Sequence, residues 1–298
     1  MNQINHMLLN ETNSSHGLVP AHKKSFQERI TAENIPETFS MGNMDIKLFC
    51  ISGVTILLIV TAEGLLKDSG KHRLSDEFYN TLFEVSSCCE IFKNFTLKNM
   101  TKWIDDSLSW EAPLELEQKF PFYQAGYDTE NRPVWVFEIG KYDYKGQVAK
   151  GPEGIEELEK YLYRNTLIML EVGHRQAERN KGASIKGISQ ALAIFDYDKF
   201  KLIDFIRPST IAAFQEVLYT HSHLLNAVWS KVLMINLPFP PDLIKTVTFP
   251  ILGPLVKKLK VYGRRCQWEP VLKRLIPNDS LPTWYGGSKD FKPIRIYG

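Results

Sequence analysis

A short apolar run at Val232–Ile235 constrains the fold more than any other stretch of this sequence. Asn236 and Pro238 close the run. A segment this short without a polar residue is typical of a strand buried on both faces of a sheet. Such a strand needs a covering layer on each side, so the rest of the chain has to supply apolar segments for both faces.

Predicted strands and helices alternate ahead of this run. Residues 134–139 and 189–195 have the pattern of strands. A long helix over about 151–182 separates them, and a second helix from Pro208 to about Leu225 leads to the central strand. Strand–helix alternation is typical of a parallel sheet with right-handed crossovers. The predicted fold class is therefore α/β, with a mostly parallel sheet flanked by helices.

An apolar helix and then a basic strand are predicted after the central strand. Pro240–Asp242 start the helix, because proline is favoured in a first helical turn. Its apolar face comprises Leu243, Ile244, Val247, Ile251 and Leu252. Residues 255–262 form the next strand candidate, and the local cations are Lys257, Lys258, Lys260, Arg264 and Arg265. An apolar helix beside a cationic rim suits a lid that meets membrane, and a core helix beside a solvated charge run is the alternative.

Composition places the chain among globular proteins. It has 298 residues, of which 44% are hydrophobic and 23% are charged, enough for one large core or two smaller ones. The formal charge of +2 gives no overall field for nucleic acid. Four cysteines without a CxxC pair favour free thiols in a reducing compartment. We expect a cytoplasmic monomer that is peripheral at membranes.

The pattern along the chain predicts four regions. Residues 1–45 are polar and aperiodic, which predicts a disordered arm. Residues 46–115 form an N-terminal helical region, 116–290 the main domain and 291–298 a tail. Within the second region, Leu48–Leu66 is long enough for a membrane helix, but its polar residues favour a buried helix or strand.

No motif for catalysis was found. The chain has no GxGxxG after a strand, no GxxxxGK[ST] and no GxSxG. His221 and His223 form an HxH pair that lacks a third metal ligand. Asp196 and Asp198 follow a strand, where we interpret them as turn residues that cap the next segment. We therefore predict no catalytic residue, no metal and no cofactor, and binding is favoured over catalysis.

Five motifs, in order and at fitting distances, resemble those of the CRAL-TRIO lipid-binding family. They are Phe122–Asp128 with Arg132–Trp135, Ile194–Asp196, Ile235–Pro238, Leu259–Gly263 and Leu281–Gly287. Phe95–Trp110 also resembles the end of that family's N-terminal helical region. The resemblance covers roughly Phe92–Gly287 and is nearest to animal cytosolic members related to phosphatidylinositol- and tocopherol-transfer proteins. Those members carry a further β-sandwich domain, which we expect to be missing here.

The resemblance implies an apolar cavity that holds one lipophilic ligand. It also implies a gate helix over the cavity, here at about 241–252, and exchange of the ligand at membranes. By position relative to tocopherol-type members, the ligand-binding residues are Phe195, Leu202, Leu225 and Val232, with plain core packing as their alternative role. Lys258 matches the family's phosphate-facing lysine.

One departure from the family bears on the ligand. The phosphatidylinositol-transfer branch has a Tyr-Pro-Glu triplet before the central strand, and its carboxylate binds the inositol headgroup. The corresponding residues here are Leu225, Asn226 and Ala227, so the acid is absent. A less polar lipid is therefore favoured. The alternatives are a phosphoinositide-sensing adaptor that does not transfer lipid, and an α/β enzyme.

Overall fold

The computed structural model describes residues 74–298, apart from 88–91, 181–187, 202–221, 223 and 239–252. The predicted arm at 1–45, the apolar stretch Leu48–Leu66 and the expected gate helix at 241–252 lie outside the described residues. In the part of the chain that is described, no helix is long and apolar enough to cross a membrane.

A six-stranded sheet forms the centre of the described region, with the strand order β5-β4-β3-β2-β1-β6. Strands β2 to β5 pair in parallel, whereas β1 pairs antiparallel with both β2 and β6. The predicted mostly parallel sheet is confirmed. The strand bounds are β1 (Phe122–Tyr127), β2 (Pro133–Phe137), β3 (Ala191–Asp196), β4 (Trp229–Ile235), β5 (Leu259–Val261) and β6 (Arg295–Tyr297).

The α-helices whose bounds the structure gives are α4 (Asp76–Ser86), α5 (Leu97–Ser109), α6 (Leu114–Lys119), α7 (Tyr144–Ala149), α8 (Pro152–Asn180) and α12 (Arg265–Leu275). Helices α4 and α5 lie within residues 46–115, where the sequence predicts a helical region. The Ser75 side chain accepts the Phe78 N–H at the start of α4, and Thr96 forms a capping box with Asn99 at the start of α5. These side chains satisfy N–H groups that have no partner within the helix.

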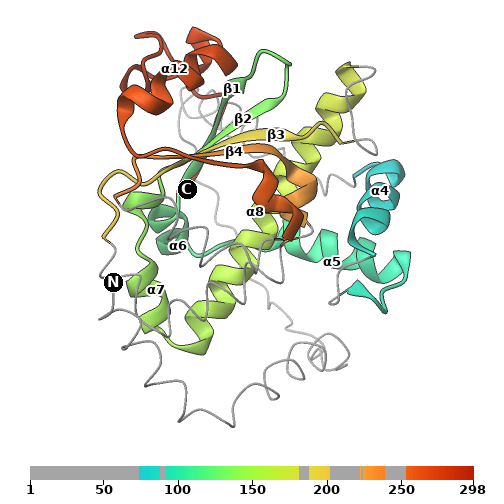
Figure 1. Ribbon diagram of the computed structural model, residues 1–298. Coiled ribbons are helices and arrows are strands. Elements are labelled where there is room, and N and C mark those ends of the chain that lie inside the picture. The colour runs from blue at the N-terminus through green and yellow to red at the C-terminus, as the bar shows by residue number, and fades with distance from the viewer. Residues whose placement is uncertain (1–73, 88–91, 181–187, 202–221, 223, 239–252) are drawn as a thin grey trace, which may run out of the picture. The chain divides into compact units, whose positions relative to one another are not determined.

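The central strand β4 is covered on both faces, as its sequence requires. Val232 and Met234 belong to one core cluster, to which helices α4, α5 and α8 contribute. Leu233 and Ile235 point to the opposite face and pack with residues of α12 and the segment that follows it. Helices α8 and α12 accordingly lie on opposite sides of the sheet (Figure 1).

The predicted strand over 255–262 is wrong in its first half. Only Leu259–Val261 pairs with β4, and residues Gly253–Lys258 form a 3-10 helix. Pro254 explains the difference, because its fixed φ and missing N–H suit a first helical turn and not a paired strand. This turn buries Leu255 and leaves Lys257 exposed.

Helix α12 begins at Arg265, and Pro270 lies inside it. The Gln267 side chain accepts the N–H groups of Gly263 and Arg264, which caps the start of the helix.

Two strands of the sheet, β1 and β6, were not predicted from the sequence. β6 lies within residues 291–298, which were assigned to a tail. Aromatic stacking holds it to the sheet, since the Phe122 ring stacks on Tyr297 at 4.8 Å and on Phe137 at 5.4 Å between centroids. Three residues are too few to show the alternation that is typical of a strand. Pairing with β1, and not the local sequence, therefore determines that these residues form a strand.

A buried polar network joins the carboxyl ends of β3 and β4 to the C-terminal segments. Asp196 accepts hydrogen bonds from the Asn236 amide at 2.8 Å and from the Tyr285 hydroxyl at 2.7 Å. The Trp268 indole N–H donates to the Asn236 side-chain oxygen at 2.9 Å. Asp196 also accepts the N–H of Asp198, which confirms its interpretation as a turn residue.

Backbone conformation makes this network possible. Asn236 has a φ of 56°, in the left-handed region that asparagine tolerates better than most residues. Gly286 has a φ of 87° directly after Tyr285, a conformation that glycine adopts without strain. Burial, with the Asp196 carboxylate nearby, raises the pKa of the Tyr285 hydroxyl far above its usual value. The hydroxyl therefore stays protonated and donates to Asp196.

Tyr285→Phe is expected to lower the free energy of unfolding by about 1–3 kcal/mol, because one oxygen of the buried Asp196 carboxylate loses its donor. Urea unfolding of both proteins measures the difference. Tyr127→Phe is the matched control, since its hydroxyl has no hydrogen-bond partner among the described residues, and it should change stability little. Equal destabilisation by both substitutions would show that the hydrogen bond to Asp196 contributes nothing.

Candidate functional site

Three of the predicted ligand-binding residues lie in one apolar cluster. Val232 is a buried member of this cluster, and Phe195 and Leu225 pack against it while partly exposed. The cluster lies on the face of the sheet opposite α12. Leu202 lies outside the described residues.

Phe195 is part of a continuous apolar row across four strands. The register pairs Phe137 with Phe195, Phe195 with Met234, and Met234 with Val261. Phe137, Phe195 and Val261 are only partly buried, and Met234 is buried. The Phe137 and Phe195 rings meet edge to face at 5.0 Å between centroids. We call these four side chains the apolar row, and they present a wall without a polar atom.

Sequence reasoning named Phe195 but missed the other three members of the row. Alternation along a strand shows which residues share a face. It does not show which residues of two strands become neighbours, because that register is set in three dimensions. Phe137, Met234 and Val261 could therefore be assigned to a face but not to this row.

Lys258 lies at the amino end of the strands, away from the apolar row. Its ammonium group donates to the backbone carbonyl of Asn226 at 2.6 Å. Gln190 donates to the same carbonyl at 3.1 Å and to that of Ala227 at 3.3 Å. Residues 224–228 end a helix just before β4, so these carbonyls are the ones left without an intrahelical donor. Lys258 and Gln190 therefore cap the end of this helix.

The electrostatic state of Lys258 is unusual for a lysine. Burial lowers the pKa of its side chain, since removal of water disfavours the charged form. No acidic side chain among the described residues forms an ion pair with it. The Asn226 side-chain oxygen nearby is buried and has no hydrogen-bond partner within the described part of the chain. A half-buried cation and an unused acceptor thus lie beside the end of this helix.

The cationic rim is smaller than the sequence indicated. Arg265 pairs with Glu269, with 2.6 Å between its Nε and the carboxylate, because i and i+4 residues are neighbours on a helix. Lys258 binds the Asn226 carbonyl. The other three cations of the rim are exposed and have no acidic partner among the described residues; they are Lys257, Lys260 and Arg264. We call these three residues the free rim.

Two hollows on the described surface lie elsewhere. One has a volume of about 270 Å³ and is lined by aromatic residues such as Trp284 and Phe291. The other has a volume of about 740 Å³ and lies between α4 and α5, with Asp105 and Lys102 among its lining residues. Neither contains a predicted ligand-binding residue. The predicted cavity beside the apolar row stays a prediction, since the expected gate helix lies outside the described residues.

A family model and several known proteins match this chain. The family model described as the CRAL/TRIO domain matches residues 117–287. Protein ctg-1 of Caenorhabditis elegans is 21% identical over 196 residues, which cover 66% of this chain and 49% of that protein. Protein real-time of Aedes aegypti is 21% identical over 220 residues, which cover 66% of this chain and 32% of that protein. The chain thus spans about half or less of the length of these relatives.

Among solved structures, the crystal structure of Sfh5 aligns with a TM-score of 0.43 and 11% identity, covering 75% of this chain and 76% of its own. The family model matches more than half of the chain and includes five of the six described strands, β1 to β5. The chain belongs to the CRAL/TRIO domain family.

Proposed function

We propose that this chain binds one lipophilic molecule against the apolar row of its sheet and transfers or presents it at membrane surfaces. The CRAL/TRIO domain is a lipid-binding and lipid-transfer module, which supports binding in general. The observation that carries the finer proposal is the apolar row of Phe137, Phe195, Met234 and Val261, which is in register on one face and, apart from Met234, only partly buried.

The free energy of binding would come mainly from apolar burial. Removal of apolar surface from water contributes about 25 cal/mol per Å², so 400 Å² of a lipid contributes roughly 10 kcal/mol. A molecule held this way leaves only where it finds another apolar medium. The proposed gate at 241–252 would open at a bilayer, because the bilayer accepts both the ligand and the apolar face of that helix.

The polar end of the site would orient the ligand. Lys258 precedes β5 and lies near the level of Lys231 on β4, about three residues or 10 Å along the strand from Met234. A ligand with one weakly polar end would place it beside Lys258 and Asn226, and its apolar body along the sheet. An inositol headgroup needs acceptors for its hydroxyls, and Ala227 supplies none.

A phosphoinositide-sensing adaptor is the second candidate. The half-buried Lys258, which has no acidic partner among the described residues, is the observation that favours it, because a phosphate would restore a counter-charge. This function needs binding of the lipid but no transfer between membranes.

Val232→Trp is expected to cut lipid loading at least several-fold while the protein stays folded, because the larger side chain fills space beside the apolar row. Organic extraction of the purified protein, followed by mass spectrometry, measures the lipid per chain. Val271→Trp makes the same change on α12, at the other face of the sheet, and should retain loading. Equal loading of both variants and the wild type would place the ligand elsewhere.

Ala227→Glu is expected to shift ligand preference toward phosphatidylinositol, since it restores a carboxylate where the family's acid stands. The wild type should prefer neutral lipophiles such as a tocopherol, retinoid or sterol precursor, because an unpaired buried hydroxyl costs about 1–3 kcal/mol, or roughly five- to a hundredfold in affinity. Competition with labelled phosphatidylinositol measures this, and Ala149→Glu on an exposed position of α7 is the control. Preferential loading of phosphatidylinositol by the wild type would favour the adaptor.

Lys257→Glu/Lys260→Glu is expected to weaken binding to anionic vesicles about thirtyfold or more, since each cation near such a surface contributes about 1 kcal/mol. The binding should also fall as salt rises from 0.1 to 1 M, where the screening length drops from about 10 to 3 Å. Lys98→Glu/Lys102→Glu makes the same charge change on exposed positions of α5 and should bind normally. If both double variants lose binding equally, net charge and not the free rim attracts the protein.

A further inference from the structure

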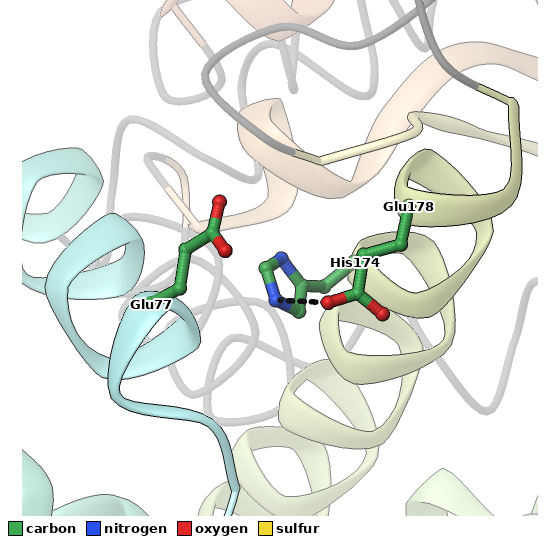
Figure 2. Close-up of side chains that lie close together, drawn as sticks. All are labelled: Glu77, His174 and Glu178. Carbon is green, nitrogen blue, oxygen red and sulfur yellow. Dashed lines mark ion pairs between the residues drawn. The ribbon is translucent and has the colours of Figure 1, made fainter.

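His174 occupies a buried position between α8 and the start of α4, as Figure 2 shows. Its ring meets the Phe78 ring edge to face at 5.4 Å between centroids. Its Nε2 lies 3.2 Å from the Ser75 hydroxyl, the residue that caps α4. The imidazole is therefore fixed by packing and by a hydrogen bond, and it belongs to neither the apolar row nor the free rim.

Two glutamates converge on this imidazole from different helices (Figure 2). Glu178 follows His174 by four residues on α8, so helical geometry places both on one face. Its carboxylate lies 3.7 Å from Nε2. Glu77 extends toward the imidazole ring from the first turn of α4 (Figure 2), and one donor atom from each of the three residues lies within 4.8 Å of the other two.

These separations are close to those of a bound transition-metal ion. Zn–N and Zn–O bonds of roughly 2.0–2.2 Å in a tetrahedral site place neighbouring donors about 3.3–3.5 Å apart. The His174–Glu178 distance is already near that value. Both glutamates are exposed, so rotation of their side chains can close the remaining gap of roughly 1 Å without moving the core.

The charge around the cluster favours a cation. Neither Glu77 nor Glu178 pairs with a lysine or arginine among the described residues, and the neighbouring Arg175 binds Glu171. Two carboxylates and one imidazole give a ligand set with a net charge of −2. The start of α4 opposes a cation, but that dipole is equivalent to only about half a unit charge.

We propose that Glu77, His174 and Glu178 bind a divalent transition-metal ion of the zinc class, which joins α4 to α8. One imidazole and two carboxylates suit zinc, whereas calcium and magnesium prefer sites made only of oxygen. Three protein ligands leave a fourth position for water. The metal replaces the Ser75 contact at Nε2, and Ser75 keeps its bond to the Phe78 N–H.

The consequence of binding is a firmer attachment of α4. A ligand that binds only the folded state stabilises it by mass action. At a zinc concentration a hundredfold above Kd, the melting temperature of a domain of this size should rise by about 5–10 °C. Because the ligands come from both helices, the amide hydrogens of α4 should exchange more slowly when zinc is present.

The test compares two double variants of the full chain that carry the same charge change. Glu77→Gln/Glu178→Gln removes both carboxylates and leaves the buried His174 in place. Glu84→Gln/Glu153→Gln changes one exposed glutamate at the far end of each of the same two helices. Zinc affinity is measured by competition with a chromogenic chelator, and thermal unfolding and α4 hydrogen exchange are measured with and without zinc.

The wild type and the control variant should bind one zinc ion at this site and show both the thermal shift and slower exchange in α4. Glu77→Gln/Glu178→Gln should bind zinc at least about tenfold more weakly, since even the loss of a supporting partner costs 10- to 100-fold. It should also lose the α4 protection. Equal zinc binding by all three proteins would overturn the proposal, and would assign the metal to other histidines or cysteines of the chain. Absence of binding by the wild type would overturn it as well.

Discussion

The burial of β4 on both faces is the constraint on which the rest of the structure depends. Its apolar residues alternate between two core clusters, so the chain has to bring cover to each side. One cover comes from helices that precede the strand in sequence, α4, α5 and α8. The other comes from α12 and the segment after it. A parallel β2–β5 sheet with helices on both sides follows directly, because no single element could bury both faces.

The two faces of the sheet differ in how they are packed. On the α12 side, Asp196, Asn236, Trp268 and Tyr285 connect strand ends to the C-terminal segments through hydrogen bonds that leave little freedom. Buried polar groups are costly unless they are all satisfied, so this face is specified closely. The opposite face carries large apolar side chains that are only partly covered. A fold built this way can hold its sheet rigid from one side and offer the other side to a ligand.

Much of the fold could be predicted from the sequence, and the elements and contacts that were missed have physical causes. β2, β3, β4 and α8 were predicted because each is long or apolar enough to show its period. β6 was missed because three residues show none, and the Tyr297–Phe122 stacking that fixes it is a long-range contact. Lys258 could be placed by resemblance, but its bond to the Asn226 carbonyl depends on tertiary packing. The i, i+4 spacing of Arg265 and Glu269 was visible and would have shown that the rim is smaller.

The proposed site separates the source of affinity from the source of orientation. The apolar row can supply most of the free energy of binding, since that energy scales with buried area and needs no particular head. Lys258 contributes differently, because burial lowers its pKa and its described partner is the Asn226 backbone carbonyl, which carries only partial charge. A ligand with an acceptor oxygen at one end recovers part of the solvation that the ammonium group has lost. A fully charged headgroup would interact more strongly with Lys258. Its transfer out of water would also cost more free energy, because the missing acid leaves the hydroxyl groups of such a headgroup without an acceptor. A weakly polar head therefore satisfies both ends of the site at the lowest desolvation cost.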